Sequence, residues 1–173
     1  INIKEKHAFV SLNYDQQCTL KNDTNTLDYE LADGQVITIN DQLFKASEPL
    51  FNPSLLKQHC DNKSIQQAIV DCYKSCPDEL KEEMISNIIV VGGTSNTTNF
   101  SKRLQIELNN EFKLQNIDII NNCKVNLITP KNAQLSTMNG ALTYCSMQEF
   151  NDSLITRQHY DEYGPTEALI HFY

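Results

Sequence analysis

A glycine pair, Gly92 and Gly93, follows the apolar run 88–91 and precedes Thr94 and a polar stretch. Glycine has no Cβ, so its backbone N–H groups can come close to a ligand, and the N-terminus of a following helix favours an anion. The pattern predicts either a turn that approaches a phosphate or a plain connection between a strand and a helix. It is not a P-loop, because the Lys-Ser/Thr pair that ends such loops is missing.

The histidines and cysteines do not form a pattern of known chemistry. Neither His7, His59, His159 nor His171 has a Ser or Cys nearby in a nucleophile-elbow context. A metal site could be drawn from His59, Cys60, Cys72 and Cys76, but the paired C-x₂-C spacing of structural zinc is absent. We therefore expect no catalytic residue and no metal site in this chain.

The cysteine spacing also bears on the redox compartment. Six cysteines are irregularly spaced in a chain of 173 residues, which is too long to need disulfide bonds for stability. The six are Cys18, Cys60, Cys72, Cys76, Cys123 and Cys145. Reduced thiols that pack as ordinary small side chains, in a cytosolic or nuclear compartment, are the favoured interpretation.

Composition and charge exclude several classes of function. The chain is 40% hydrophobic and 21% charged with only five glycines and five prolines, which is typical of a globular protein with a packed core. A net charge of −8 argues against a surface that follows nucleic-acid phosphates. No apolar run approaches the roughly 18 residues that span a bilayer. We expect neither nucleic acid nor a membrane among the partners.

The elements that must position the glycine pair can be read from hydrophobic periodicity. Strands are predicted over residues 7–12, over 34–39 paired as a hairpin with residues 43–44 across Asn40 and Asp41, and over 88–91 and 125–128. The run 88–91 is fully apolar, as in a sheet covered on both faces. The polar stretch 13–28 is predicted to be a loop. Strands separated by helices indicate an α/β fold.

Helices are predicted at five places. They cover residues 64–76 with Ser64 as N-cap, 77–84, 100–112, 137–147, and 156–163 ended by Gly164 with Pro165 beyond. Residues 1–6 are good helix formers without a cap, so the chain is expected to open inside a helix, as a fragment would.

Several short motifs, in order along the chain, carry a resemblance to a known family. They are IKEK at 3–6, DGQVITI at 33–39 with EPLFNPS at 48–54, GGT at 92–94, and RQHYDEYGP at 157–165. The chain resembles the C-terminal part of actin and the actin-related proteins, in the superfamily that includes the Hsp70 ATPase domain and the sugar kinases.

The resemblance implies a fold and a division of the chain. The fold is α/β, an actin-like ATPase fold with an incomplete ribonuclease H-like second half and C-terminal helices that return to the first half. Residues 1–63 would belong to the smaller nucleotide-flanking subdomain with a β-hairpin, and residues 64–136 to the larger subdomain. Residues 137–173 would be the returning helical segment.

The resemblance also implies a nucleotide site. The Gly92–Thr94 turn would approach the nucleoside and first phosphate, and Lys4 and Glu5 would reach the ribose and base across the cleft. If the resemblance is set aside, Lys4 and Glu5 are more simply interpreted as solvent-exposed charges on the face of a helix. Two departures weaken the site: polar residues at 96–99 replace an apolar and aromatic run, and Gln134 replaces a lysine.

Other family surfaces can be placed on the chain in the same way. The groove where actin-binding proteins insert a helix maps to Tyr144 and Met147, with Thr143, Glu149 and Ser153 beside them. The alternative is a solvated helix end. Residues 55–63 replace an apolar filament loop with a shorter polar one, so an actin-like filament is not expected.

The functional expectation follows from these assignments. The chain would form one wall of an ATP/ADP cleft in a cytoplasmic, cytoskeletal actin-like protein that forms filaments poorly. Mg²⁺ and the catalytic groups would come from the N-terminal half, so the chain alone would bind no cofactor and the parent would be at most a weak ATPase. Its partners would be that missing half and actin-binding or complex subunits. The alternative is a scaffold subunit of a chromatin-remodelling or motor complex, including a nuclear one, with vestigial nucleotide binding.

Overall fold

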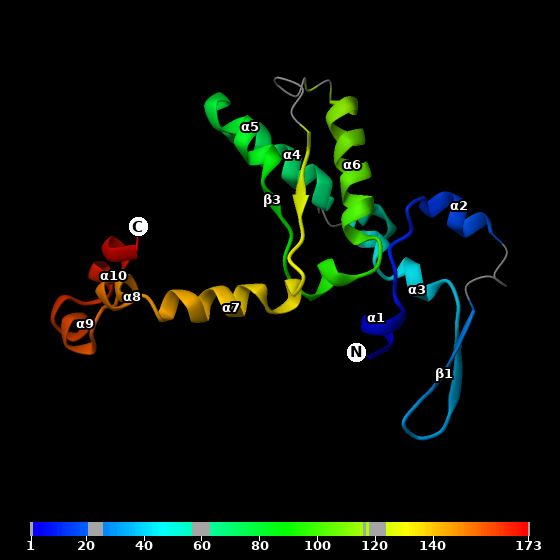
Figure 1. Ribbon diagram of the computed structural model, residues 1–173, viewed down its shortest axis with the longest axis horizontal. Helices are drawn as coiled ribbons and strands as arrows, with labels where there is room; N and C mark the ends of the chain where they lie inside the picture. Colours follow the sequence, from blue (N-terminus) through cyan, green and yellow to red (C-terminus); the bar gives the residue numbers. More distant parts are fainter. Residues whose placement is uncertain (1, 21–25, 57–62, 116, 118–123, 173) are drawn as a thin grey trace. The chain divides into compact units, whose positions relative to one another are not determined.

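The computed structural model describes residues 2–20, 26–56, 63–115, 117 and 124–172 (Figure 1). The chain divides into two compact units, residues 1–134 and residues 135–173. No helix among the described residues is both long enough and apolar enough to cross a lipid bilayer. The three-part division expected from the sequence stays a prediction.

The N-terminal segment contains two short helices, α1 (Asn2–His7) and α2 (Tyr14–Thr19). Between them the backbone is extended and forms one isolated parallel bridge, from Phe9 to Thr98, instead of the regular strand predicted over 7–12. The loop prediction for 13–28 is wrong at α2, where the Asn13 side chain accepts a hydrogen bond from the Gln16 backbone N–H as an N-cap. This helix buries no side chain, so it has no apolar stripe for periodicity to detect.

The hairpin exists, but its turn is not where the sequence placed it. Strand β1 (Leu27–Glu30) pairs antiparallel with β2 (Val36–Ile39). The turn between them uses Gly34 at φ +83°, a left-handed conformation that glycine adopts without strain. Asp33 Oδ1 accepts from the Gln35 backbone N–H at 3.0 Å, which holds the turn. The sequence also favours a turn at Asn40-Asp41, because its turn chemistry is similar.

The residues predicted as the returning strand form helical turns instead. Helix α3 (Gln42–Lys45) buries Leu43 and Phe44, and the 3₁₀ helices η2 (Glu48–Leu50) and η3 (Pro53–Leu55) follow it. Phe44 is fully buried. A helical turn brings its ring within 5.9 Å, centroid to centroid, of the ring of Phe9. Residues 43–44 therefore bury the Phe44 ring from a helical turn and do not form the second strand of a hairpin.

Helices α4 (Ile65–Ser75) and α5 (Asp78–Ser86) confirm the sequence prediction to within two residues at each end. Ser64 and Gln67 form a reciprocal capping box at the start of α4, which satisfies two backbone N–H groups that the first helical turn leaves without partners. Pro77 separates the two helices, since proline cannot continue α4.

A second two-stranded sheet pairs β3 (Ile88–Ile89) in parallel with β4 (Leu127–Ile128). Helix α6 (Phe100–Leu114) packs against α4. The expectation that residues 88–91 lie in a sheet covered on both faces is wrong within the described part of the chain, because Ile89 is 63% exposed. The core of this unit lies between α4, α5 and α6, and its buried members are Val10, Phe51, Val70, Tyr73, Ile85, Phe100, Leu104, Leu108, Phe112 and Val125.

The C-terminal unit is helical. Helix α7 (Ala133–Cys145) starts in the preceding unit and is followed by α8 (Gln148–Asp152), α9 (Arg157–Tyr163) and α10 (Pro165–Phe172). Gly164 follows α9 at φ +75°, in agreement with the predicted end of this helix, and the Thr156 side chain caps its start. Pro165 does not simply end the helical region: it begins α10, since the first helical position tolerates a residue without a backbone N–H.

Candidate functional site

The glycine turn and the first helix border one pocket of about 390 Å³. Lys4 and Glu5 come from α1, and Gly93 and Thr94 come from η4 (Gly93–Asn96), a 3₁₀ helix. Asn96, Thr97 and Gln134 complete the lining. The structure thus brings four of the five residues predicted for the nucleotide site to one pocket, although about 90 residues of chain separate the two groups.

The bridge between Phe9 and Thr98 explains this convergence. The Val10 backbone N–H donates to the Thr98 carbonyl oxygen at 2.9 Å, and the Phe9 N–H donates to the Leu43 carbonyl oxygen at 3.1 Å. The first bond holds the segment that follows α1 alongside the segment that follows η4, and the second holds it to α3. Because α1 ends only two residues before Phe9, its residues Lys4 and Glu5 lie near the glycine turn.

Gly92, the fifth predicted residue, shapes the turn and does not line the pocket. Its φ is +101°, a conformation that other residues rarely adopt. Its N–H donates to the Ala133 carbonyl oxygen at 2.8 Å, while its own carbonyl oxygen accepts from the Ser95 hydroxyl at 2.7 Å. Gly92 therefore fixes the turn against the start of α7 and holds Gly93 at the pocket.

Gly93 is the glycine that leaves room in the pocket. A Cβ added at Gly93 would lie 3.8 Å from Gln134 Cγ, an ordinary contact, and its φ is not in the left-handed region. A methyl group is therefore tolerated by the backbone and would occupy pocket space. The expected α-helix N-terminus does not follow the pair, because η4 intervenes and α6 begins only at Phe100.

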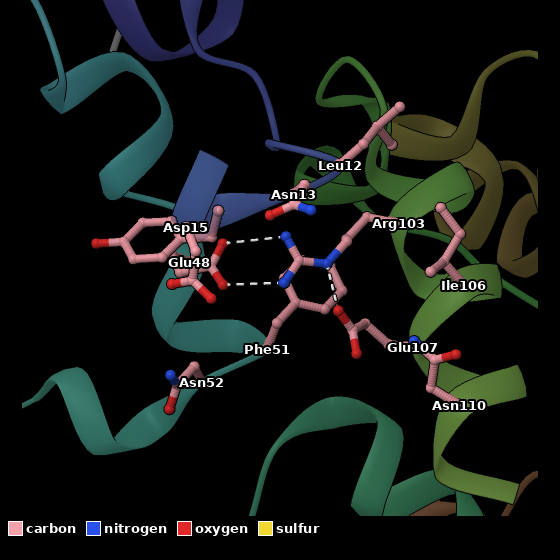
Figure 2. Close-up of a pocket in the computed structure, with 11 residues that line it drawn as sticks. Leu12, Asn13, Asp15, Glu48, Phe51, Asn52, Arg103, Ile106, Glu107 and Asn110 are labelled. Carbon is pink, nitrogen blue, oxygen red and sulfur yellow. Dashed lines mark hydrogen bonds and ion pairs between the residues drawn. The ribbon is translucent and has the colours of Figure 1, made fainter. Parts of the chain in front are cut away.

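A second pocket, of about 410 Å³, surrounds a buried arginine (Figure 2). Arg103 on α6 donates from Nη2 to Glu48 Oε1 at 3.1 Å and from Nε to Glu107 Oε1 at 2.6 Å. Its Nη1 donates to the Ser11 carbonyl oxygen at 2.6 Å. The Arg103 side chain is 8% exposed and that of Glu48 is 2% exposed. One guanidinium therefore joins three segments of the chain.

Burial dominates the electrostatics of Glu48. Loss of solvent raises the pKa of Glu48 above its ordinary value, and Glu107 and Asp15 add to this as like charges. Arg103 opposes the shift through its charge and its hydrogen bonds, without cancelling it. The sequence analysis missed this pair. The available signal was a cation three residues after Phe100, on the apolar face of α6, with a carboxylate one turn later.

Comparison with known proteins identifies the family. The sequence model of the family described as Actin matches residues 1–172. This chain belongs to the actin family. A relative named "Putative actin-29", from Dictyostelium discoideum, is 33% identical over 170 residues, which is 94% of this chain and 41% of the relative. The actin-family chain thus spans less than half the length of this curated relative.

The predicted partner groove of this actin-family chain lies in its C-terminal unit. The Tyr144 ring on α7 makes an edge-to-face contact with Phe150 of α8 at 5.6 Å between centroids, and its hydroxyl lies 3.4 Å from Ser153 Oγ. Tyr144 is 47% exposed and Met147 is 46% exposed. Both have surface left for a contact, and their role in partner binding stays a prediction.

Two of the four residues of the possible metal site, His59 and Cys60, lie outside the described part of the chain. Within the described ranges, no three His, Cys, Asp or Glu side chains are close enough together to hold a metal ion. Cys123 also lies outside the described residues, as does most of the predicted polar loop 55–63. Cys18, Cys72, Cys76 and Cys145 are free thiols.

Proposed function

We propose that this chain forms one wall of an ATP/ADP-binding cleft in an actin-like protein. The observation that carries the proposal is the convergence of Lys4 and Glu5 with Gly93 and Thr94 around one pocket. The Lys4 ammonium group supplies a positive charge, the Glu5 carboxylate can accept hydrogen bonds from ribose hydroxyls, and Gly93 lets a ligand approach the backbone.

The rest of the site is proposed to lie in chain upstream of this one, including the groups that hold Mg²⁺ and position the attacking water. Phosphoryl transfer depends on such placed groups. The proposed role of this chain is therefore binding and not catalysis, with the nucleotide holding two halves of a longer protein together. Asn96 and Thr97 offer no aromatic face to the base, so base stacking, usually worth about 1 kcal/mol, is lost at these positions.

The test is thermal unfolding of the full-length protein with and without Mg²⁺-ATP. A ligand that binds only the folded state at 100 times its Kd stabilises it by about 2.7 kcal/mol, which raises Tm measurably. We expect Gly93→Ala to reduce the ATP-dependent rise by filling the pocket, and Lys4→Gln to reduce it by removing the charge. Lys6→Gln and Gly140→Ala are matched controls, because neither residue lines the pocket.

Two outcomes contradict the nucleotide proposal. One is the absence of any ATP-dependent rise in Tm for the unsubstituted protein. The other is an ATP-dependent rise that Gly93→Ala and Lys4→Gln leave unchanged, since the nucleotide would then bind elsewhere.

We place this actin-like protein in the cytoplasm, with a cytoskeletal role exercised through partners and not through filaments. Tyr144 and Met147 are the proposed anchors for an actin-binding protein or a complex subunit. Because residues 55–63 are mostly polar, they lack the burial of about 25 cal/mol per Å² that an apolar filament loop would contribute. Sedimentation of the full-length protein in polymerising salt tests this, and robust pelleting would refute it.

The second candidate is a scaffold subunit of a chromatin-remodelling or motor complex in which nucleotide binding is vestigial. The polar lining by Asn96, Thr97 and Gln134 favours it, since none of these side chains supplies a charge or a ring. Nuclear localisation, together with stable association in a complex and no ATP-dependent rise in Tm, would select this function over the first.

A further inference from the structure

Two sulfur-bearing side chains, those of Cys76 and Met84, meet where α4 passes into α5, and a third, that of Cys72, lies one helical turn before Cys76. Cys72 lies in the last turn of α4, Cys76 is the C-cap residue that follows α4, and Met84 lies on α5. Cys76 Sγ is 3.0 Å from Met84 Sδ and 3.2 Å from the Cys72 carbonyl oxygen. The two cysteines are four residues apart, a spacing that places helical side chains on one face.

The third sulfur belongs to the same neighbourhood. Cys72 and Met84 both line a pocket of about 220 Å³ whose other walls include Tyr73, Ile85 and Phe112. Met84 therefore contacts the Cys76 sulfur directly and shares a pocket lining with Cys72. Cys72 and Met84 are exposed and Cys76 is half-buried, so the cluster is open to a small ion from solvent.

One cation stands beside this cluster. Lys81 lies over the Tyr73 ring, with Nζ 5.7 Å from the ring centroid. The pKa of Lys81 is raised chiefly by its hydrogen bond to Asp78, and Cys76 adds a smaller electrostatic contribution. Lys81 also forms an ion pair with Asp78, with 2.5 Å between Nζ and Oδ1.

We propose that Cys72, Cys76 and Met84 form a binding site for a soft monovalent metal ion, Cu(I). On binding, the two S–H bonds break, their protons go to solvent, and each thiolate forms a bond to copper. The Met84 thioether donates a lone pair without losing a proton, and no electron is transferred because copper enters as Cu(I). The complex carries one net negative charge.

The ligand set selects the metal. Thiolate and thioether ligands suit Cu(I), whereas structural zinc requires four ligands from thiolates, imidazoles or carboxylates in a closed tetrahedron. The cluster offers two thiols and one thioether, and among the described residues no three His, Cys, Asp or Glu side chains form an alternative set. This site shares no residue with the nucleotide pocket and is independent of the proposed function.

The test is anaerobic titration of the 173-residue chain with Cu(I) in competition with a chromophoric Cu(I) chelator. We expect one Cu(I) per chain and a thiolate-to-copper absorption band in the ultraviolet. Cys76→Ser and Met84→Leu are each expected to weaken binding at least tenfold. Met84→Leu keeps the apolar volume and removes only the sulfur, so it separates ligation from packing. Cys145→Ser, at an exposed thiol in the other unit, is the matched control.

Circular dichroism checks that each variant keeps its helical content. The proposal is overturned if the chain does not compete with the chelator, or if Met84→Leu binds as tightly as the unsubstituted chain. It is also overturned if Cys145→Ser weakens binding as much as Cys76→Ser does, or if Zn(II) displaces Cu(I) at equal concentration.

Discussion

Replacing Arg103 is expected to cost far more stability than replacing an exposed charged residue, because the Arg103 side chain is only 8% exposed. Arg103→Met keeps an apolar stem of similar length and removes the guanidinium. Glu48 would then be a carboxylate only 2% exposed without its cation, and the Ser11 carbonyl oxygen would lose its donor at 2.6 Å. Glu107, whose side chain is 24% exposed, can turn to water and adds less.

The magnitude follows from this burial. Removing one partner of a buried ion pair costs about 3–5 kcal/mol, because the other charge stays buried without compensation. For a chain of 150–250 residues, 1 kcal/mol corresponds to roughly 2–4 °C in Tm. We therefore expect Arg103→Met to lower Tm by about 6–20 °C, measured by circular dichroism at neutral pH.

An exposed pair provides the matched control. Arg157 lies 3.5 Å from Asp161, and its side chain is 95% exposed. Arg157→Met should therefore cost about 0–1 kcal/mol. The double variant Glu48→Gln/Arg103→Met should lose less than the sum of the two single variants, since it leaves no unpaired buried charge. A loss below about 1 kcal/mol for Arg103→Met, equal to that of the control, would refute this reasoning.

Three further predictions concern the same chain. Because burial raises the pKa of Glu48, the folded state binds this proton more tightly than the unfolded state, so its contribution to stability is largest at low pH. That contribution falls as pH rises from the ordinary glutamate pKa, about 4.3, through the raised pKa of folded Glu48. The free energy of unfolding in urea, measured across this pH range, should show this decrease in the unsubstituted chain and not in Glu48→Gln. Ser64→Ala removes the α4 cap and should cost about 1 kcal/mol in urea unfolding, whereas Ser64→Asn should cost little. Leu108→Ala empties a fully buried position and should cost about 2–5 kcal/mol by the same measurement, while Leu114→Ala, at a position 77% exposed, should be nearly neutral.

Local signals in the sequence located α4, α5, α6 and α9 to within two residues. Ser64 and Pro77 bound α4 within a residue, because capping and the missing proline N–H act over a few neighbouring residues. The hairpin shows where such signals end. Asp33-Gly34 and Asn40-Asp41 are both good turn sequences, so the sequence does not tell which of them closes the hairpin. In the structure a helix that buries Phe44 beside Phe9 follows the second of them.

The candidate nucleotide residues were named from family motifs, and the pocket that joins them was not visible in the sequence. Lys4 and Gly93 meet because Phe9 bridges Thr98, a contact between segments almost 90 residues apart. No local rule specifies such a pairing, since closing a long loop depends on the packing of everything between its ends. Arg103 was passed over for the same reason.

The sequence by itself determined the family and the limits of the capped and strongly periodic helices, because these depend on motifs and on interactions between near neighbours. The tertiary structure decided which side chains are buried and which distant ones meet. It separated the two glycines into Gly92, which shapes the turn, and Gly93, which leaves room in the pocket. It also places the Arg103 guanidinium in contact with two other segments of the chain, and burial makes these electrostatic interactions far stronger than they would be in water.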